Sequence, residues 1–195
     1  MFEIFQYDFV QNALISAFII SISSGIIGTL IVVNRMVFLS GGIAHSAYGG
    51  IGIALYLGIS ITLGAALFAI AVSLLISFLT LRDKERSDTV IGVIWALGMA
   101  IGVIFIDLTP GYNVDMMSYL FGSILAISSE DIYFSSFMMS LIILCIALFY
   151  RDFLSLSYDQ EFALTRGVKV GFMHTLLLLL SALSIVISIR VVGLI

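Results

Sequence analysis

Six long apolar stretches, separated by short polar segments, are the feature that most constrains this chain. Each approaches or exceeds the roughly 20 residues that an α-helix needs to cross the hydrocarbon core of a membrane. Only 10% of the 195 residues are charged, whereas a soluble domain carries roughly 25%. We therefore predict one all-α, polytopic transmembrane domain over residues 1–195. The predicted spans are about residues 9–33, 36–58, 60–81, 89–107, 130–150 and 172–194.

The connections between these stretches predict how the chain is oriented. Residues 116–128 are apolar but too few for a comfortable crossing, so we expect a re-entrant or interfacial segment there. Basic residues favour the cytoplasmic side of a membrane. Six of the eight fall in two segments, Arg82, Lys84 and Arg86 in one and Arg151, Arg166 and Lys169 in the other. Both segments are expected inside, with the N-terminus and the region around Pro110 outside.

The longest polar stretch, about residues 151–171, carries apolar residues among its charges. Asp159 stands where it can cap a short helix, and Gly167 where it can end one. A short amphipathic helix on the cytoplasmic face predicts a docking element for another protein. The alternative is a helix that lies on the lipid surface.

The second span contains His45 within the sequence SGGIAHSAYGG. Its glycines recur at four-residue spacing, which lets helices approach closely in lipid. An ionisable side chain at that depth needs a partner or water, and neutral imidazole is a common ligand of divalent metals. Two interpretations stay open, a metal ligand on an ion path and a histidine that only packs. Asp107 and Asp115, beside the external segment, could attract cations.

Several functions have no support in the sequence. There is no phosphate-binding loop with its lysine, so the chain is not expected to hydrolyse ATP. The metalloprotease motif His-Glu-x-x-His and paired cysteines are absent from the sequence, and Cys145 is the only cysteine. No basic stripe suggests a nucleic-acid partner. We expect no enzymatic activity and no bound cofactor.

Three stretches, in matching order, resemble the permease subunits of zinc, manganese and iron ABC importers. They are RMVFLSGGIAHSAYGGIGIALYLGI, TPGYNVDMMSYLFGSILAISSEDI and SYDQEFALTRGVKV. The resemblance implies a homodimeric or heterodimeric permease in a bacterial plasma membrane, in contact with two cytoplasmic ATPase subunits. It also implies an external metal-binding protein that delivers Zn²⁺, Mn²⁺ or Fe²⁺.

The resemblance also implies roles for single residues. His45 matches the histidine that members of the family place along the ion path, and Asp159, Glu161, Ala163 and Gly167 fall in the ATPase-coupling loop. Many members have an aspartate four residues before the histidine, where this chain has Gly41. Further ligands would then come from a partner subunit or from Asp107 and Asp115. Members of the family usually continue beyond the position of Ile195, so a C-terminally truncated permease is expected.

A second hypothesis is a small secondary cation carrier or channel that needs no ATPase, with His45 as a proton or cation relay. The stretch 151–171 distinguishes the two, because a carrier has no use for a structured docking helix there.

Overall fold

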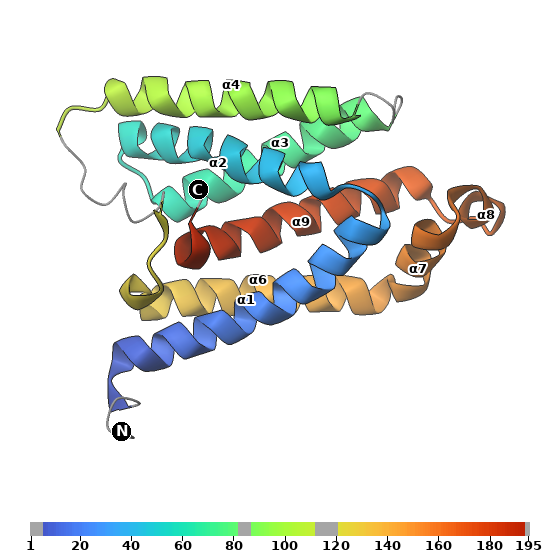
Figure 1. The fold of residues 1–195 in the computed structure, drawn as a ribbon, viewed down its shortest axis with the longest axis horizontal. Helices are drawn as coiled ribbons and strands as arrows, with labels where there is room; N and C mark the ends of the chain where they lie inside the picture. Colours follow the sequence, from blue (N-terminus) through green and yellow to red (C-terminus); the bar gives the residue numbers. More distant parts are fainter. Residues whose placement is uncertain (1–5, 82–86, 112–120, 194–195) are drawn as a thin grey trace.

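The structure is a computed structural model, and it describes residues 6–81, 87–111 and 121–193. These residues form helices and connecting segments without a β-strand, which confirms the all-α prediction. Six helices are long and apolar enough to cross a membrane, and their ends lie within two residues of the predicted spans. They are α1 (Asp8–Val33), α2 (Val37–Leu57), α3 (Ile61–Thr80), α4 (Ser87–Asp107), α6 (Ser129–Leu148) and α9 (Val170–Val192) (Figure 1).

The short elements lie at the two ends of this bundle. Helices α7 (Tyr150–Tyr158) and α8 (Gln160–Thr165) follow α6 at one end, beside the turn from α1 to α2 (Figure 1). At the opposite end lie the end of α4, the start of α6 and the 3₁₀ turn η3 (Ile124–Ala126). The last residue of α4 and the first residue of α6 thus lie at the same end of the bundle. Residues 121–128 do not cross the bundle, as predicted, and residues 116–120 lie outside the described residues.

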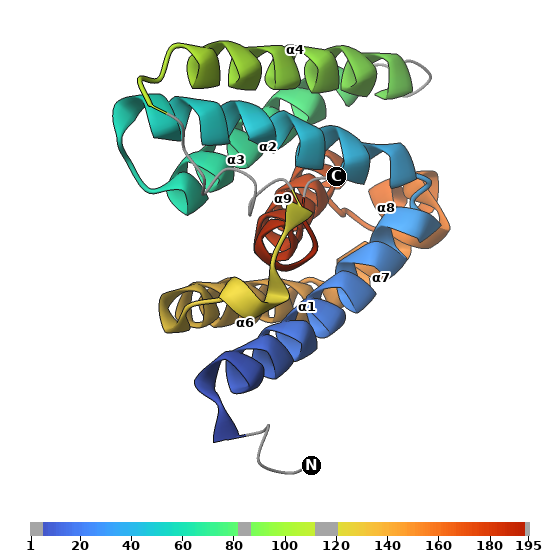
Figure 2. The ribbon, with the colours of Figure 1, turned by 60° about the vertical axis from the view of Figure 1, so that its left-hand side comes forward.

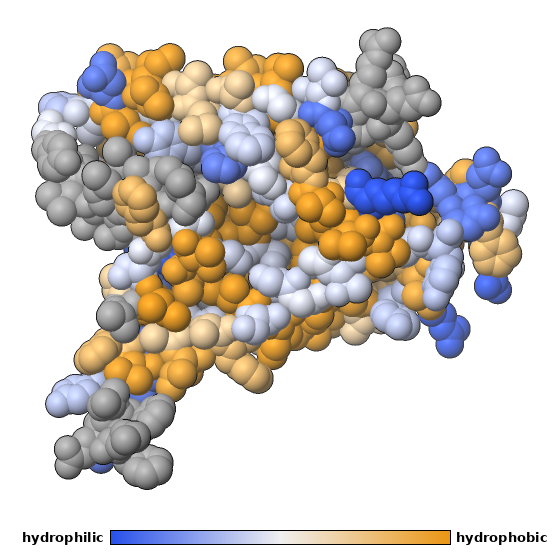
Figure 3. Space-filling model, viewed as in Figure 1, coloured by the Kyte–Doolittle hydropathy of each residue, from blue (hydrophilic) through white to orange (hydrophobic). Residues whose placement is uncertain are grey.

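The surface agrees with this division into a middle and two ends. Apolar residues cover much of the face shown in Figure 3, and hydrophilic residues gather most densely at the end with α7 and α8. This is the end to which the basic segment around Arg166 contributes. An excess of Arg and Lys marks the cytoplasmic side of a membrane protein, so we call this the inner end and the opposite one the outer end.

Two clusters of buried apolar side chains form the core, and α9 contributes to both. The first cluster joins α9 to α2, α3 and α4; the second joins α9 to α1, α6, α7 and α8. Figure 2 shows α9 lying between the two groups of helices. Met36, in the turn between α1 and α2, packs against both clusters. The bundle therefore consists of two packed groups that share one central helix.

Bare backbone sets the distance between α2 and its neighbours. A Cβ atom added at Gly52 would lie 2.5 Å from the carbonyl oxygen of Gly102 in α4. One added at Gly98 of α4 would lie 2.6 Å from the Cα atom of Ser46. The Ser46 hydroxyl also bonds the Ile94 carbonyl oxygen of α4 at 3.2 Å. The predicted close approach through the glycines of the second span is thus made to α4, and Gly50 makes the same kind of contact to Gly64 of α3.

We predict that Gly98→Ala destabilises the bundle, because the new methyl group would meet the backbone of α2 and force the helices apart. Overpacking of this kind costs about 1–3 kcal/mol. Gly92→Ala is the matched control on the same helix, since a Cβ atom there meets nothing within 4 Å. Thermal unfolding of both variants in nanodiscs tests this. An unfolding temperature of Gly98→Ala as high as that of Gly92→Ala would show that α2 and α4 are not in contact here.

Candidate functional site

His45 lies in the middle of α2, half-buried, with its ring against α4. The imidazole stacks on the indole of Trp95, with ring centroids 4.3 Å apart and planes within 5° of parallel. The indole Nε1 in turn donates a hydrogen bond to the sulfur of Met99, 3.1 Å away. A stacked ring pair is stabilised by about 0.5–1.5 kcal/mol beyond the area it buries. Trp95 therefore fixes the plane of the imidazole ring.

His45 also borders a groove of about 540 Å³ between α1, α2 and α9. Its lining is unusual for a surface between apolar helices, because small residues and hydroxyl groups recur along it. Gly28, Gly41 and Ala44 provide room, and the serines are Ser24, Ser40, Ser181, Ser184 and Ser188. Hydroxyl oxygens and water are suitable partners for a partly dehydrated cation. The groove thus brings one imidazole together with serine hydroxyl groups, of which those of Ser181 and Ser184 are buried and hydrogen-bonded within the bundle.

The predicted acidic partners of His45 are not beside it. Asp107 is the last residue of α4, twelve residues beyond Trp95, which corresponds to about 18 Å along a helix axis. Asp115 lies outside the described residues. Within the described part of the chain, no three His, Cys, Asp or Glu side chains gather in a way that could hold a metal ion. The roles of His45, Asp107 and Asp115 as ligands stay predictions, and this chain alone supplies His45 with neutral neighbours.

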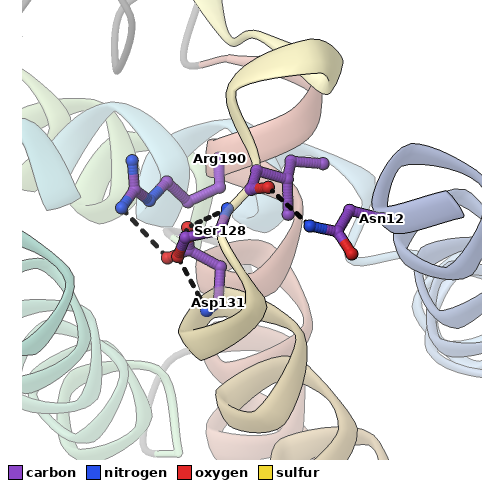
Figure 4. Close-up of polar contacts among 5 residues, drawn as sticks. Asn12, Ser128, Asp131 and Arg190 are labelled. Carbon is purple, nitrogen blue, oxygen red and sulfur yellow. Dashed lines mark hydrogen bonds and ion pairs between the residues drawn. The ribbon is translucent and has the colours of Figure 1, made fainter. Parts of the chain in front are cut away.

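Asp131, another acid of the outer segment, is engaged in contacts within the chain (Figure 4). It accepts hydrogen bonds from the backbone N–H and the hydroxyl of Ser128, at 3.1 and 2.7 Å, and completes the N-terminal capping box of α6. Arg190 of α9 forms an ion pair with its other oxygen at 3.0 Å. Asn12 of α1 donates to the carbonyl oxygen of Ile127 nearby. These contacts hold the start of α6 to α1 and α9 at the outer end.

The predicted helix of the 151–171 stretch is α8, and its ends follow the predicted rules. The Asp159 carboxylate accepts hydrogen bonds from the backbone N–H groups of Glu161 and Phe162, at 2.9 and 3.2 Å. Gly167, just beyond the helix, has φ +80°, a conformation that favours glycine. The helix is amphipathic, with Ala163 fully buried in the second cluster.

The burial of Ala163 changes which residues of α8 can contact another protein. A buried methyl group holds α8 to α7 and is out of reach of a partner. The exposed residues of α8 are Glu161, Thr165 and two large apolar side chains, Phe162 at 51% and Leu164 at 57% exposure. Sequence reasoning did not single out these two as docking residues. The available signal was their position on either side of the small Ala163. So short a helix can bury only one face, and when Ala163 is on that face its two neighbours are exposed.

His174, the second histidine, lies near the start of α9 at the inner end. Its Nε2 atom is 3.2 Å from the hydroxyl oxygen of Thr80 in α3, within hydrogen-bond distance. A second polar pair on the same two helices joins Ser77 and Thr175 at 2.7 Å. His174 is therefore part of the packing between α3 and α9 and makes a suitable control for His45.

Comparison with known proteins gives a consistent result. The model of a family described as the ABC 3 transport family matches residues 6–195. An uncharacterised membrane protein of Synechocystis is 44% identical over the whole chain, which covers 69% of that protein. The manganese transport system membrane protein MntC of Listeria monocytogenes is 35% identical over 97% of the chain and 68% of its own length.

A solved structure is similar as well. PsaBC from Streptococcus pneumoniae, determined in complex with an antibody fragment, has a chain that superposes with a TM-score of 0.82 at 30% identity. The match covers 97% of this chain and 69% of that one. Among the relatives, this chain spans 64–69% of the length of the Synechocystis, Listeria and Chlamydia muridarum proteins.

The stacking of His45 on Trp95 predicts a direct spectroscopic test of metal binding. Trp95 is the only tryptophan of the chain, so its fluorescence reports on this position alone. We expect saturable quenching by Co²⁺ or Mn²⁺, because an open-shell ion bound to the imidazole would lie beside the indole. His45→Gln should lose the saturable phase and His174→Gln should keep it. Equal quenching of the wild type and His45→Gln would show that the ion binds elsewhere.

Proposed function

The chain belongs to the ABC 3 transport family, and on that premise we propose that it is the membrane-spanning permease of an ATP-driven importer of divalent metal ions. The ion would be Mn²⁺, Zn²⁺ or Fe²⁺, and Mn²⁺ is favoured because the similar MntC of Listeria monocytogenes is a manganese transport system membrane protein. The observation that carries the proposal is the position of His45, the histidine that borders a groove of small and hydroxyl-bearing residues between apolar helices in the described part of the chain.

The chemistry of this groove suits transit better than storage. A neutral imidazole can bind and release a divalent ion without first exchanging a proton. With Gly41 in place of an acid, and hydroxyl groups as the other neighbours, the ion keeps part of its water shell and is held weakly. Tight binding would need further anionic ligands, and these would have to come from a second permease subunit, because Asp107 lies about 18 Å along the helix axis from Trp95.

The proposed partners follow from the two ends of the bundle. At the inner end, α8 presents Glu161, Phe162 and Leu164 to an ATPase subunit, and two such subunits would serve a dimer of permeases. At the outer end, an external metal-binding protein would deliver the ion. ATP hydrolysis would reside in the separate ATPase chains. In the alternative, a cation carrier without an ATPase, the two large apolar side chains exposed on this capped helix would have to lie on the lipid surface instead.

We predict that His45→Ala abolishes ATP-dependent uptake of Mn²⁺ into proteoliposomes while the permease still binds its ATPase subunit. The reason is that, among the residues that the structure describes, no other histidine borders the groove. His174→Ala is the matched control and should retain uptake, since that ring bonds Thr80 outside the groove. Normal uptake by His45→Ala would show that His45 only packs against its neighbours and that the groove is not the path of the ion.

We further predict that Phe162→Ala combined with Leu164→Ala weakens binding of the ATPase subunit at least tenfold. Burial of one such side chain contributes about 1.5–3 kcal/mol, and tenfold corresponds to about 1.4 kcal/mol. Leu154→Ala on α7 is the control, an apolar residue with 44% exposure that faces a groove beside α1. Binding is measured with the permease in nanodiscs. If the double variant binds the ATPase normally, α8 is a lipid-surface helix.

A further inference from the structure

The groove that contains His45 is formed where α1 and α2 diverge. Figure 2 shows the two helices meeting at their turn, beside α7 and α8, and separating toward the outer end. The groove lies between them, with α9 as its third wall. The direction of α1 relative to α2 therefore sets how wide the groove is around His45.

The turn at the point of divergence is stiff. The N–H of Met36 bonds the carbonyl oxygen of Ile31 at 2.9 Å, and the N–H of Arg35 bonds that of Val32 at 3.0 Å. These two hydrogen bonds are the pattern of a Schellman C-cap, a motif that usually has glycine at the position taken here by Arg35. Arg35 has φ +58° there. The turn is closed by two hydrogen bonds, and Met36 is packed against both clusters. We therefore expect a displacement of the turn to move the start of α2 with it.

One side chain of this turn is bonded to α7. The Asn34 Nδ2 donates to the hydroxyl oxygen of Ser157 at 2.9 Å and to the carbonyl oxygen of Leu30 in its own helix at 2.8 Å. The side chain thus joins the end of α1 to the last turn of α7. Asn34 is half-buried, as is Ser157, so the bond is partly protected from water.

Helices α7 and α8 form one unit at this point. Asp159 ends α7 and caps α8, while Phe153, Leu156 and Ala163 are buried in one cluster. On the other side, a cavity of about 340 Å³ separates this unit from α2 and α4, lined by Leu156 and Gln160 on one wall and Leu39 and Asp88 on the other. The cavity leaves α7 and α8 room to move against α2 without direct packing.

We propose that the Asn34–Ser157 hydrogen bond transmits the displacement of α8 to the turn between α1 and α2, and so changes the width of the groove around His45. This inference rests on the proposed function, since it takes the ATPase as the source of the displacement. Asn34 and Ser157 are positioning residues, because neither lines the groove. They act through the angle between α1 and α2.

The test compares two serines of the same helix. Ser157→Ala removes the bond to Asn34. Ser155→Ala is the matched control, because the Ser155 hydroxyl bonds the carbonyl oxygen of Arg151 within α7 at 2.9 Å. The measurement is Mn²⁺ taken up per ATP hydrolysed, with the full permease, its ATPase and its binding protein in proteoliposomes. We expect the amount of Mn²⁺ taken up per ATP to fall about fivefold in Ser157→Ala. A factor of about five corresponds to the loss of one side-chain hydrogen bond of about 1 kcal/mol.

Further variants separate transmission from simple loss of stability. Ser157→Thr retains a hydroxyl group and should retain the ratio. Asn34→Ala combined with Ser157→Ala should be no worse than Asn34→Ala alone, because residues that act through one bond are not additive. A wild-type ratio in Ser157→Ala, or additive losses in the double variant, would overturn the proposal.

A distance measurement reports on the groove itself. Spin labels replace Phe18 on α1 and Leu57 on α2, which are 67% and 60% exposed, in a Cys145→Ala background. Nucleotide binding to the ATPase should change their separation in the wild type and in Ser155→Ala but not in Ser157→Ala. If the wild type takes up no Mn²⁺, the proposed function fails and this inference with it. If it does and Ser157→Ala keeps the distance change, only the transmission through this bond is wrong.

Discussion

The close contact of the α2 backbone with α3 and α4 is the constraint on which the rest of the molecule depends. Lipid is as apolar as leucine, so helices in a membrane associate through van der Waals contact and hydrogen bonds, and small residues allow both. Gly50 and Gly52 place α2 directly against Gly64 and Gly102. One face of α2 is therefore fixed, and its remaining surface, with Gly41 and His45, is left to border a groove. Trp95 belongs to the fixed helix α4, so the same contact also orients the imidazole ring.

The two ends of the bundle are held in different ways. At the outer end, Asp131, Arg190 and Asn12 connect α6, α9 and α1 (Figure 4), and a hydroxyl pair between Ser23 and Ser184 joins α1 to α9 further along. At the inner end, the turn between α1 and α2 is bonded to α7 and borders a cavity. Helices α1 and α6 are thus held to α9 at the outer end and in the middle of the bundle. The inner end borders a cavity and has space for movement. This arrangement suits a permease in which a displacement of α8 at the inner end changes the positions of α1 and α2.

The sequence predicted the long helices well and their contacts poorly, for a physical reason. Length and apolar composition are sufficient to identify a membrane span, and the caps Asp159 and Gly167 follow local rules. The stack of His45 on Trp95 joins residues of two helices that are apolar all round, where periodicity does not reveal which face packs. The pairing of Asp131 with Arg190 and the burial of Ala163 depend in the same way on tertiary contacts that no local pattern encodes. The coupling role of Ala163 stays a prediction, and its burial shows that it would act through the packing of α8 and not through direct contact.

The central claim is that His45 binds the ion in transit, and the coordination of a bound Mn²⁺ tests it most directly. Electron spin echo envelope modulation detects an imidazole nitrogen bound to Mn²⁺. The sample is the permease in nanodiscs with His174→Gln, which leaves His45 as the only histidine. The account predicts nitrogen modulation that disappears when His45→Gln is added. A Mn²⁺ signal without imidazole modulation in the His174→Gln protein would contradict it.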